Sequence, residues 1–163
     1  MAVTAMVEAV TAEVAVATEA VPQRYEHAGG CHCGALRWTL ETQQDLSGFI
    51  PRACDCDFCT RHRAAWLSDP AGTVRIESRD GALCRYRQGS AQAEFLLCGR
   101  CGVLVAATCA TPDGGWRAAL NRNSADQRER CATEVVASPQ QLAAEAKRAR
   151  WLQLWTPATL SEG

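Results

Sequence analysis

The cysteines of this chain are grouped in a way that is typical of metal binding. Three of them lie in the run Cys54–Cys59, which reads CDCDFC and follows the pattern C-x-C-x-x-C. An upstream pair, Cys31 and Cys33, and a downstream pair, Cys98 and Cys101, bring the clustered cysteines to seven of ten. A short loop can direct two or three sulfurs at one zinc ion, about 2.3 Å from each sulfur. The spacing therefore predicts metal sites.

The two pairs predict one closed site. Four thiolates complete the tetrahedral coordination of a structural zinc ion. Gly102, directly after the second pair, permits the tight turn that lets backbone amides face the sulfurs. The pairs lie about 65 residues apart, so metal binding would join distant segments and contribute directly to folding. The alternative is that one pair consists of reduced core cysteines.

The triple Cys54, Cys56 and Cys59 predicts a second zinc ion with one open position. Open positions are where zinc sites bind substrate. Zinc with three thiolates has a net charge of about −1, so it is a weak Lewis acid but accepts a soft fourth ligand. A thiol substrate would bind there as its thiolate. We therefore predict that these three residues are catalytic and serve sulfur chemistry rather than hydrolysis.

The alternative for the triple is a fourth protein ligand that closes the site. The candidates are His62, Cys84, Cys109 and Cys131. We expect the last three to be small buried side chains instead, because they lie in or beside predicted strands. An iron–sulfur cluster is disfavoured because the spacing matches no ferredoxin pattern.

Charged residues surround the triple. Arg61, His62 and Arg63 follow it and are candidates for binding the carboxylate of a thiol cofactor, although an arginine pair in a loop is often simply solvated. Asp55 and Asp57 would add negative charge beside the metal, so we expect both to face outward.

Strands must position the clusters. Apolar and polar residues alternate in many short runs between turn residues, which predicts a mainly β fold. The predicted strands cover residues 35–40, 49–53, 73–77, 84–87, 94–97, 103–107, 116–120 and 132–137. Two of them flank the downstream cysteine pair, so that pair is expected at the tip of a hairpin.

One C-terminal helix is predicted. Ser138 at the N-cap and Pro139 at the first helical position indicate its start. Trp151 and Trp155 are four residues apart and should share one face. Pro157 should end the helix, and we expect its apolar face to pack on the chain's own sheet.

Composition narrows the function classes. The chain has 163 residues and a net charge of −1, which does not indicate a nucleic acid or a membrane surface as a partner. The cysteines are clustered and residues 1–23 contain no secretory signal, so we predict a metal framework rather than disulfides and a reducing cytoplasm. We interpret residues 1–23 as a mobile or irregular tail and residues 24–163 as a single zinc-binding domain.

Three segments together resemble a known family. They are GGCHCGA at 29–35, CDCDFCTRH at 54–62 and CGRCG at 98–102. In this combination the chain is similar to the glutathione-dependent formaldehyde-activating enzymes, a family that includes the centromere protein V-like proteins. The resemblance covers about residues 24 to 137.

The resemblance implies an Mss-four-like fold of antiparallel sheets around two zinc ions. The structural zinc would be held by Cys31, Cys33, Cys98 and Cys101, and the catalytic zinc by Cys54, Cys56 and Cys59. The implied activity is that of a carbon–sulfur lyase, in which glutathione and formaldehyde form S-(hydroxymethyl)glutathione. The expected partners are thus a small thiol and an aldehyde. The alternatives are a non-enzymatic zinc-stabilised binding module and a zinc or redox sensor.

Overall fold

The alternating run at residues 35–40 forms a strand, as predicted. The computed structural model describes residues 23–163, so the tail predicted for residues 1–23 lies outside the described residues apart from Gln23. Strand β1 (Tyr25–Gly30) pairs antiparallel with β2 (Leu36–Thr42). In β2 every second side chain is buried, because successive side chains of a strand point to opposite faces.

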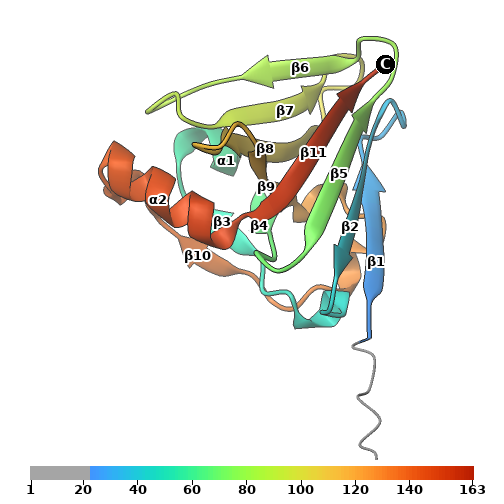
Figure 1. Ribbon diagram of the computed structural model, residues 1–163, viewed down its shortest axis with the longest axis horizontal. Helices are drawn as coiled ribbons and strands as arrows, with labels where there is room; N and C mark the ends of the chain where they lie inside the picture. Colours follow the sequence, from blue (N-terminus) through green and yellow to red (C-terminus); the bar gives the residue numbers. More distant parts are fainter. Residues whose placement is uncertain (1–22) are drawn as a thin grey trace, which may run out of the picture.

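Eleven strands form one sheet, which confirms the mainly β prediction. Their order is β1-β2-β5-β11-β9-β4-β3-β10, and β8, β7 and β6 branch from β9 (Figure 1). Most neighbours are antiparallel, whereas β11 and β10 run parallel to β5 and β3. The other strands are β3 (Arg52–Cys54), β4 (Ala65–Leu67), β5 (Thr73–Ser78), β6 (Leu83–Tyr86), β7 (Glu94–Cys98), β8 (Leu104–Ala110), β9 (Trp116–Asn121), β10 (Val135–Ala137) and β11 (Thr156–Glu162).

Helices are few and mostly short. The two α-helices of residues 23–163 are α1 (Asp57–Arg61) and α2 (Ala144–Leu154). The 3-10 turns are η1 (Leu46–Gly48), η2 (Arg122–Ser124), η3 (Arg128–Arg130) and η4 (Pro139–Gln141). Over residues 23–163, no helix is both long and apolar enough to cross a membrane.

The start predicted for the C-terminal helix is wrong. The hydroxyl of Ser138 donates to Asp55 Oδ2 at 2.6 Å instead of capping a helix, and Pro139–Gln141 forms only η4. The α-helix begins at Ala144 and ends at Leu154. Pro157 does not end the helix but lies inside β11.

Each of the eight predicted strands overlaps an observed one, but β1, β4 and β11 were not predicted. Strand β4 is only three residues long and buried on both faces, so it shows no alternation. Strand β11 contains a proline and lies between β5 and β9, where it pairs with both. Its position depends on long-range pairing that no local pattern indicates.

The core has two parts, and one cysteine cluster lies against each. The first part is centred on Leu36, Trp38 and Ile76 and includes Cys31 and Cys98. The second part includes Cys54, Cys59, Trp66, Phe95, Trp151 and Trp155. Helix α2 therefore packs on the chain's own sheet, as predicted, and does so beside the cysteine triple.

The glycine pair before the first cysteines is explained by close packing. A Cβ on Gly29 would lie 2.2 Å from Trp38 Cζ2 and 2.3 Å from the carbonyl oxygen of Ser124. The indole of Trp38 in turn donates to Ser124 Oγ at 3.0 Å. Only a residue without a side chain allows β1 to approach this buried tryptophan.

Candidate metal centres and the adjoining pocket

Four cysteines form what we call the closed cluster: Cys31, Cys33, Cys98 and Cys101. Their sulfurs all lie within 4.8 Å of one another. The Cys31–Cys33 and Cys33–Cys98 sulfur distances are both 3.6 Å. Sulfurs of a tetrahedral zinc site lie about 3.8 Å apart when each is about 2.3 Å from the metal. The four side chains thus fit a closed zinc site and could hold such an ion.

Two turns bring the closed cluster together. One connects β1 to β2, and the other connects β7 to β8, as the predicted hairpin required. Gly102 has φ +74°, the left-handed conformation that the turn after Cys101 needs. Burial raises the pKa of the Cys101 thiol, but the amides of Val103 and Cys33 and the neighbouring thiols outweigh it and lower that pKa to about 6. The turn therefore favours the thiolate that a metal requires.

All ten cysteines are free thiols. The sulfur separations of 3.6 Å in the closed cluster are far longer than the roughly 2.05 Å of a disulfide bond. This geometry agrees with the predicted metal framework and not with a disulfide scaffold.

The second group is the open cluster of Cys54, Cys56 and Cys59. Its three sulfurs also lie within 4.8 Å of one another. Cys54 ends β3, Cys56 directly precedes α1, and Cys59 lies within that helix. One strand end and one helical turn are thus enough to gather three sulfurs, as the short spacing predicted. These thiols could likewise hold a metal ion.

No fourth protein ligand is found for the open cluster. Among residues 23–163, no other His, Cys, Asp or Glu offers a ligand atom within 4.8 Å of all three sulfurs. His62 instead packs its ring against Phe58, with 4.6 Å between the ring centroids. Cys109 is buried as expected, whereas Cys131 is half-buried and Cys84 is exposed on β6, contrary to expectation.

The thiols of the open cluster differ in acidity. A hydrogen bond from Cys59 lowers the pKa of Cys54 to about 6 despite the opposing effect of burial. The same contact with Cys54, together with burial, raises the pKa of Cys59, and burial raises that of Cys56. Cys54 is therefore the first thiolate of the cluster, and a bound cation would be needed to ionise all three.

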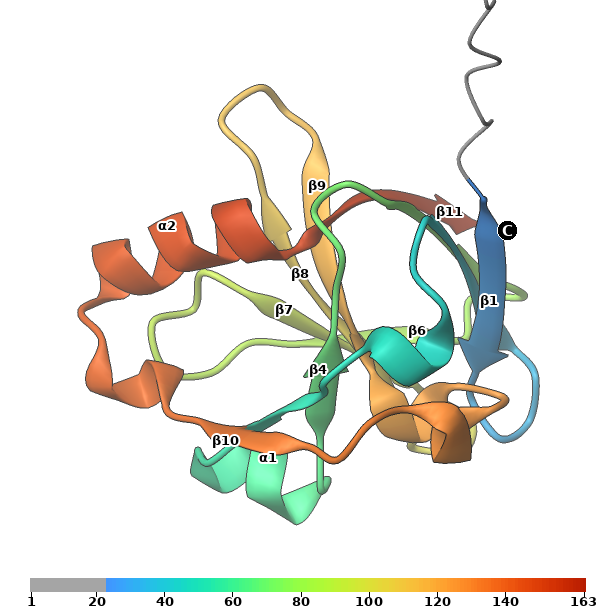
Figure 2. The ribbon, with the colours of Figure 1, turned by 90° about the horizontal axis from the view of Figure 1, so that it is seen from below.

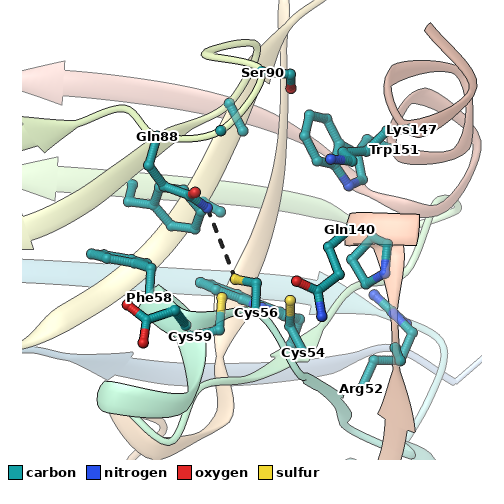
Figure 3. A pocket seen from close by; sticks show the side chains of 18 of the residues that line it. Arg52, Cys54, Cys56, Phe58, Cys59, Gln88, Ser90, Gln140, Lys147 and Trp151 are labelled. Atoms are coloured by element: carbon teal, nitrogen blue, oxygen red, sulfur yellow. Dashed lines mark hydrogen bonds between the residues drawn. The ribbon is translucent and has the colours of Figure 1, made fainter. Parts of the chain in front are cut away.

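The open cluster faces a cavity of about 640 Å³. Figure 3 shows the sulfurs of Cys54 and Cys56 inside it. The surrounding segments are β3, α1, the loop between β6 and β7, η4 and α2. Figure 2 shows that loop between α2 and the η4–β10 segment. The volume is in the range that proteins use for small-molecule ligands.

Aromatic side chains form most of the apolar lining of the cavity. The chain has five Trp, two Tyr and three Phe, and six of these ten residues line it. They are Phe58, Trp66, Tyr86, Phe95, Trp151 and Trp155. The sequence indicated that Trp151 and Trp155 share one face of the helix, but only the fold shows that they face one cavity with the other four rings.

The charged residues of the cavity differ from those expected. Arg61 lines it but is exposed and forms an ion pair with Asp57 at 3.0 Å. His62 and Arg63 are not among the lining residues, and the Arg63 carbonyl accepts a hydrogen bond from Asn123. Of the two acids expected to face outward, Asp57 does so, whereas Asp55 is half-buried beside Ser138.

Three other cations line the cavity, Arg52 from β3 and Lys147 and Arg150 from α2. We call them the cationic group. Lys147 and Arg150 are three residues apart, so their side chains project from nearly the same side of the helix. Lys147 also lies four residues before Trp151. The sequence contained this periodicity, but it did not show that β3 would bring Arg52 to the same place.

One amide side chain reaches the open cluster. Gln88, from the loop after β6, directs its Nε2 group at Cys56 Sγ, 3.9 Å away (Figure 3). No feature of the sequence indicated this residue, because the loop reaches the cluster only through the pairing of β6 with β7.

Comparison with known proteins identifies one similar solved structure. No family model matches the chain. The crystal structure of a Rhodobacter sphaeroides protein, a Northeast Structural Genomics target, shares 24% sequence identity with it. The alignment covers 68% of this chain and 99% of that chain, with a TM-score of 0.49.

Proposed function

We propose that this protein is a zinc-dependent carbon–sulfur lyase that forms and cleaves an adduct of a thiol and an aldehyde. The observation that carries the proposal is the open cluster, in which three cysteine sulfurs without a fourth protein ligand among residues 23–163 face a cavity of about 640 Å³. The resemblance of the three cysteine segments to the glutathione-dependent formaldehyde-activating enzymes supports the same chemistry.

The donor set suits zinc. Clusters of three or four thiolates select soft or borderline ions, and a ligand atom missing from the protein leaves room for a substrate. Cys54, Cys56 and Cys59 would hold the ion, and when bound it would keep a thiol substrate ionised at neutral pH.

The reaction we propose needs no oxidant or reductant. The thiol sulfur forms a bond to the aldehyde carbon, and the carbon–oxygen double bond becomes a single bond. The thiol proton is transferred to the oxygen. Glutathione and formaldehyde would give S-(hydroxymethyl)glutathione in this way. The reverse reaction returns the proton to sulfur.

The chain's own side chains would position the reactants and exclude water. Gln88 is a side-chain amide donor beside the cluster, with Nε2 3.9 Å from Cys56 Sγ. An N–H group at this position can donate to the oxygen on which negative charge develops as the carbon–sulfur bond forms. The aromatic lining limits water around the reacting atoms.

The test is the rate of exchange between glutathione, formaldehyde and their adduct, measured by NMR with metal-loaded protein. We expect faster exchange with the native chain and not with Cys56→Ser. Cys84→Ser is the matched control, because Cys84 is exposed and belongs to neither cluster. An exchange rate equal to that without protein, for this and for other thiol–aldehyde pairs, would contradict the proposed function.

A further inference from the structure

The cationic group has no acidic partner in the structure. Among the ion pairs of residues 23–163, none involves Arg52, Lys147 or Arg150. Eight other arginines of that region do form such pairs, and Lys147 is the single lysine of the chain. Three unpaired cations that line one cavity constitute a site for an anion.

Two members of the group, Arg52 and Arg150, are guanidinium groups of like charge. Arg52 is half-buried, and its guanidinium donates to Ser68 Oγ at 2.5 Å, which fixes the side chain without neutralising it. Arg150 lines the same cavity, and like Arg52 it forms no ion pair among the described residues. Two guanidinium groups that repel each other beside a cavity are stabilised when a carboxylate binds both, since each can donate two hydrogen bonds to it.

The aromatic lining lies on two sides of the cluster. On one side the Phe58 ring stacks on Tyr86 and packs against Phe95, with centroids 5.0 Å and 4.5 Å apart. On the other side Trp151 stacks on Trp155 at 5.0 Å. Figure 3 shows Phe58 and Trp151 on either side of the cysteine sulfurs. Ring faces and edges at such a site favour an aromatic ligand.

Formaldehyde matches neither the cationic group nor the aromatic lining. Formaldehyde has no charge and no ring, and its volume is a small fraction of the roughly 640 Å³ available. Glutathione carries carboxylates but no ring, so it would leave the aromatic lining without a matching group. A ligand with both a ring and a carboxylate would use both sets of side chains, because the three cations and the aromatic residues line the same cavity.

We propose that the carbonyl substrate of this site is an aromatic aldehyde that carries a carboxylate, with the carboxylate bound by Arg52, Lys147 and Arg150. This inference rests on the proposed function for the reaction itself. The thiol adds to the aldehyde carbon, the carbon–oxygen double bond becomes single, and the thiol proton ends on that oxygen, so the product is a hemithioacetal with no net oxidation.

The first test measures binding rather than activity. The probe is 4-(hydroxymethyl)benzoate, which cannot form a Schiff base with Lys147, and benzyl alcohol is the uncharged comparison. By titration calorimetry on metal-loaded protein we expect the benzoate to bind at least about tenfold more tightly than the alcohol. Equal affinities, or no binding of either compound, would overturn the proposal.

Variants of α2 locate the binding site. Arg150→Gln should weaken binding of the benzoate about tenfold and Lys147→Gln somewhat less. Arg148→Gln is the matched control, because Arg148 lies on the same helix, does not line the cavity and donates to the Ala110 carbonyl. Equal losses in Arg150→Gln and Arg148→Gln would overturn the assignment of the cationic group.

A competition experiment shows whether the cationic group binds the carboxylate of the aromatic ligand or a carboxylate of glutathione. We expect glutathione not to displace the benzoate, because the two would occupy different parts of the cavity. Displacement by glutathione with the same dependence on Arg150 would show that the cations bind the thiol, and would overturn the proposal.

An exchange measurement separates this proposal from the proposed function. With 4-carboxybenzaldehyde in place of formaldehyde, we expect a greater acceleration of hemithioacetal exchange. Acceleration for formaldehyde alone would leave the function intact and overturn the inference. Tight, Arg150-dependent binding without acceleration for any aldehyde would support the ring-and-carboxylate site and remove the proposed function.

Discussion

The sulfur atoms of Cys33 and Cys98 lie 3.6 Å apart although the residues are 65 positions apart in the sequence. One belongs to the turn between β1 and β2, and the other ends β7. A metal ion held by the closed cluster would therefore connect two turns whose strands lie in different parts of the sheet. Loss of that ion should affect the whole fold.

Cys98→Ser should unfold the protein, whereas Cys56→Ser should leave it folded with one metal ion fewer. Structural zinc contributes roughly 10 kcal/mol or more to the folding of small domains, so a lost ligand in the closed cluster removes much of the stability. Circular dichroism and the metal content per chain measure the two effects. If Cys56→Ser unfolds as completely as Cys98→Ser, the open cluster is a structural site.

Gly29→Ala should destabilise the fold by about 3 kcal/mol. The added methyl group would overlap Trp38 and the Ser124 carbonyl, at 2.2 Å and 2.3 Å, and neither buried group has space to move. Urea unfolding of the metal-loaded protein gives the change. The control is Ala28→Ser at the exposed neighbouring position of β1, where a change within about 0.5 kcal/mol is expected. A similar loss in both variants would contradict the packing explanation.

Glu94 should contribute stability that depends on pH. Burial raises the pKa of this carboxyl group, but hydrogen bonds from Arg87 and Arg85 have the larger combined effect and lower the pKa below its ordinary value of 4.5. The stabilisation is therefore present above that ordinary value and is lost as the pH falls through the lowered pKa. The difference in unfolding free energy between native protein and Glu94→Gln, about 1–3 kcal/mol at neutral pH, should shrink toward pH 3.

A matched variant tests the role of Glu94 burial. Glu162→Gln removes a more exposed partner of the same Arg85 and should cost less than about 1 kcal/mol. The comparison of each variant with the native chain at the same pH cancels the effect of acid on metal binding. A difference for Glu94→Gln that grows toward acid pH would show that its pKa is raised instead.

Gln88→Ala should slow the proposed exchange reaction about 100-fold, because donors to a developing oxyanion contribute effects of this order. Its metal content and unfolding free energy should stay unchanged, since the side chain of Gln88 has no hydrogen-bond partner other than Cys56 among the described residues. Gln92→Ala is the control on the same loop, at a position that does not line the cavity. Equal rates in the two variants, or loss of metal in Gln88→Ala, would contradict a role for this amide in the reaction.

The members of both cysteine clusters could be read from the sequence. Cys54, Cys56 and Cys59 are gathered by a single strand end and helical turn, so their spacing alone brings the sulfurs together. The closed cluster required one further step, the pairing of two turns. A tetrahedral zinc site takes four thiolates and each turn supplies two, so the sequence already indicated that the two turns come together.

The residues that surround the open cluster could not be predicted in the same way. Arg61, His62 and Arg63 are its neighbours in sequence, yet α1 directs Arg61 to Asp57 and places His62 and Arg63 outside the cavity lining. Arg52 and Arg150 are distant in sequence, and both line the cavity because α2 packs beside β3.

The sequence alone predicts the mainly β fold, most of its strands and two groups of cysteines that could hold metal ions. These features depend on local spacing and on the period-2 alternation of side chains, which a linear pattern records. The aromatic lining, the cationic group and the approach of Gln88 to Cys56 exist only in the folded chain. Those contacts arise where β3, the β6–β7 loop and α2 meet, and long-range packing, which no local pattern encodes, fixes that meeting point.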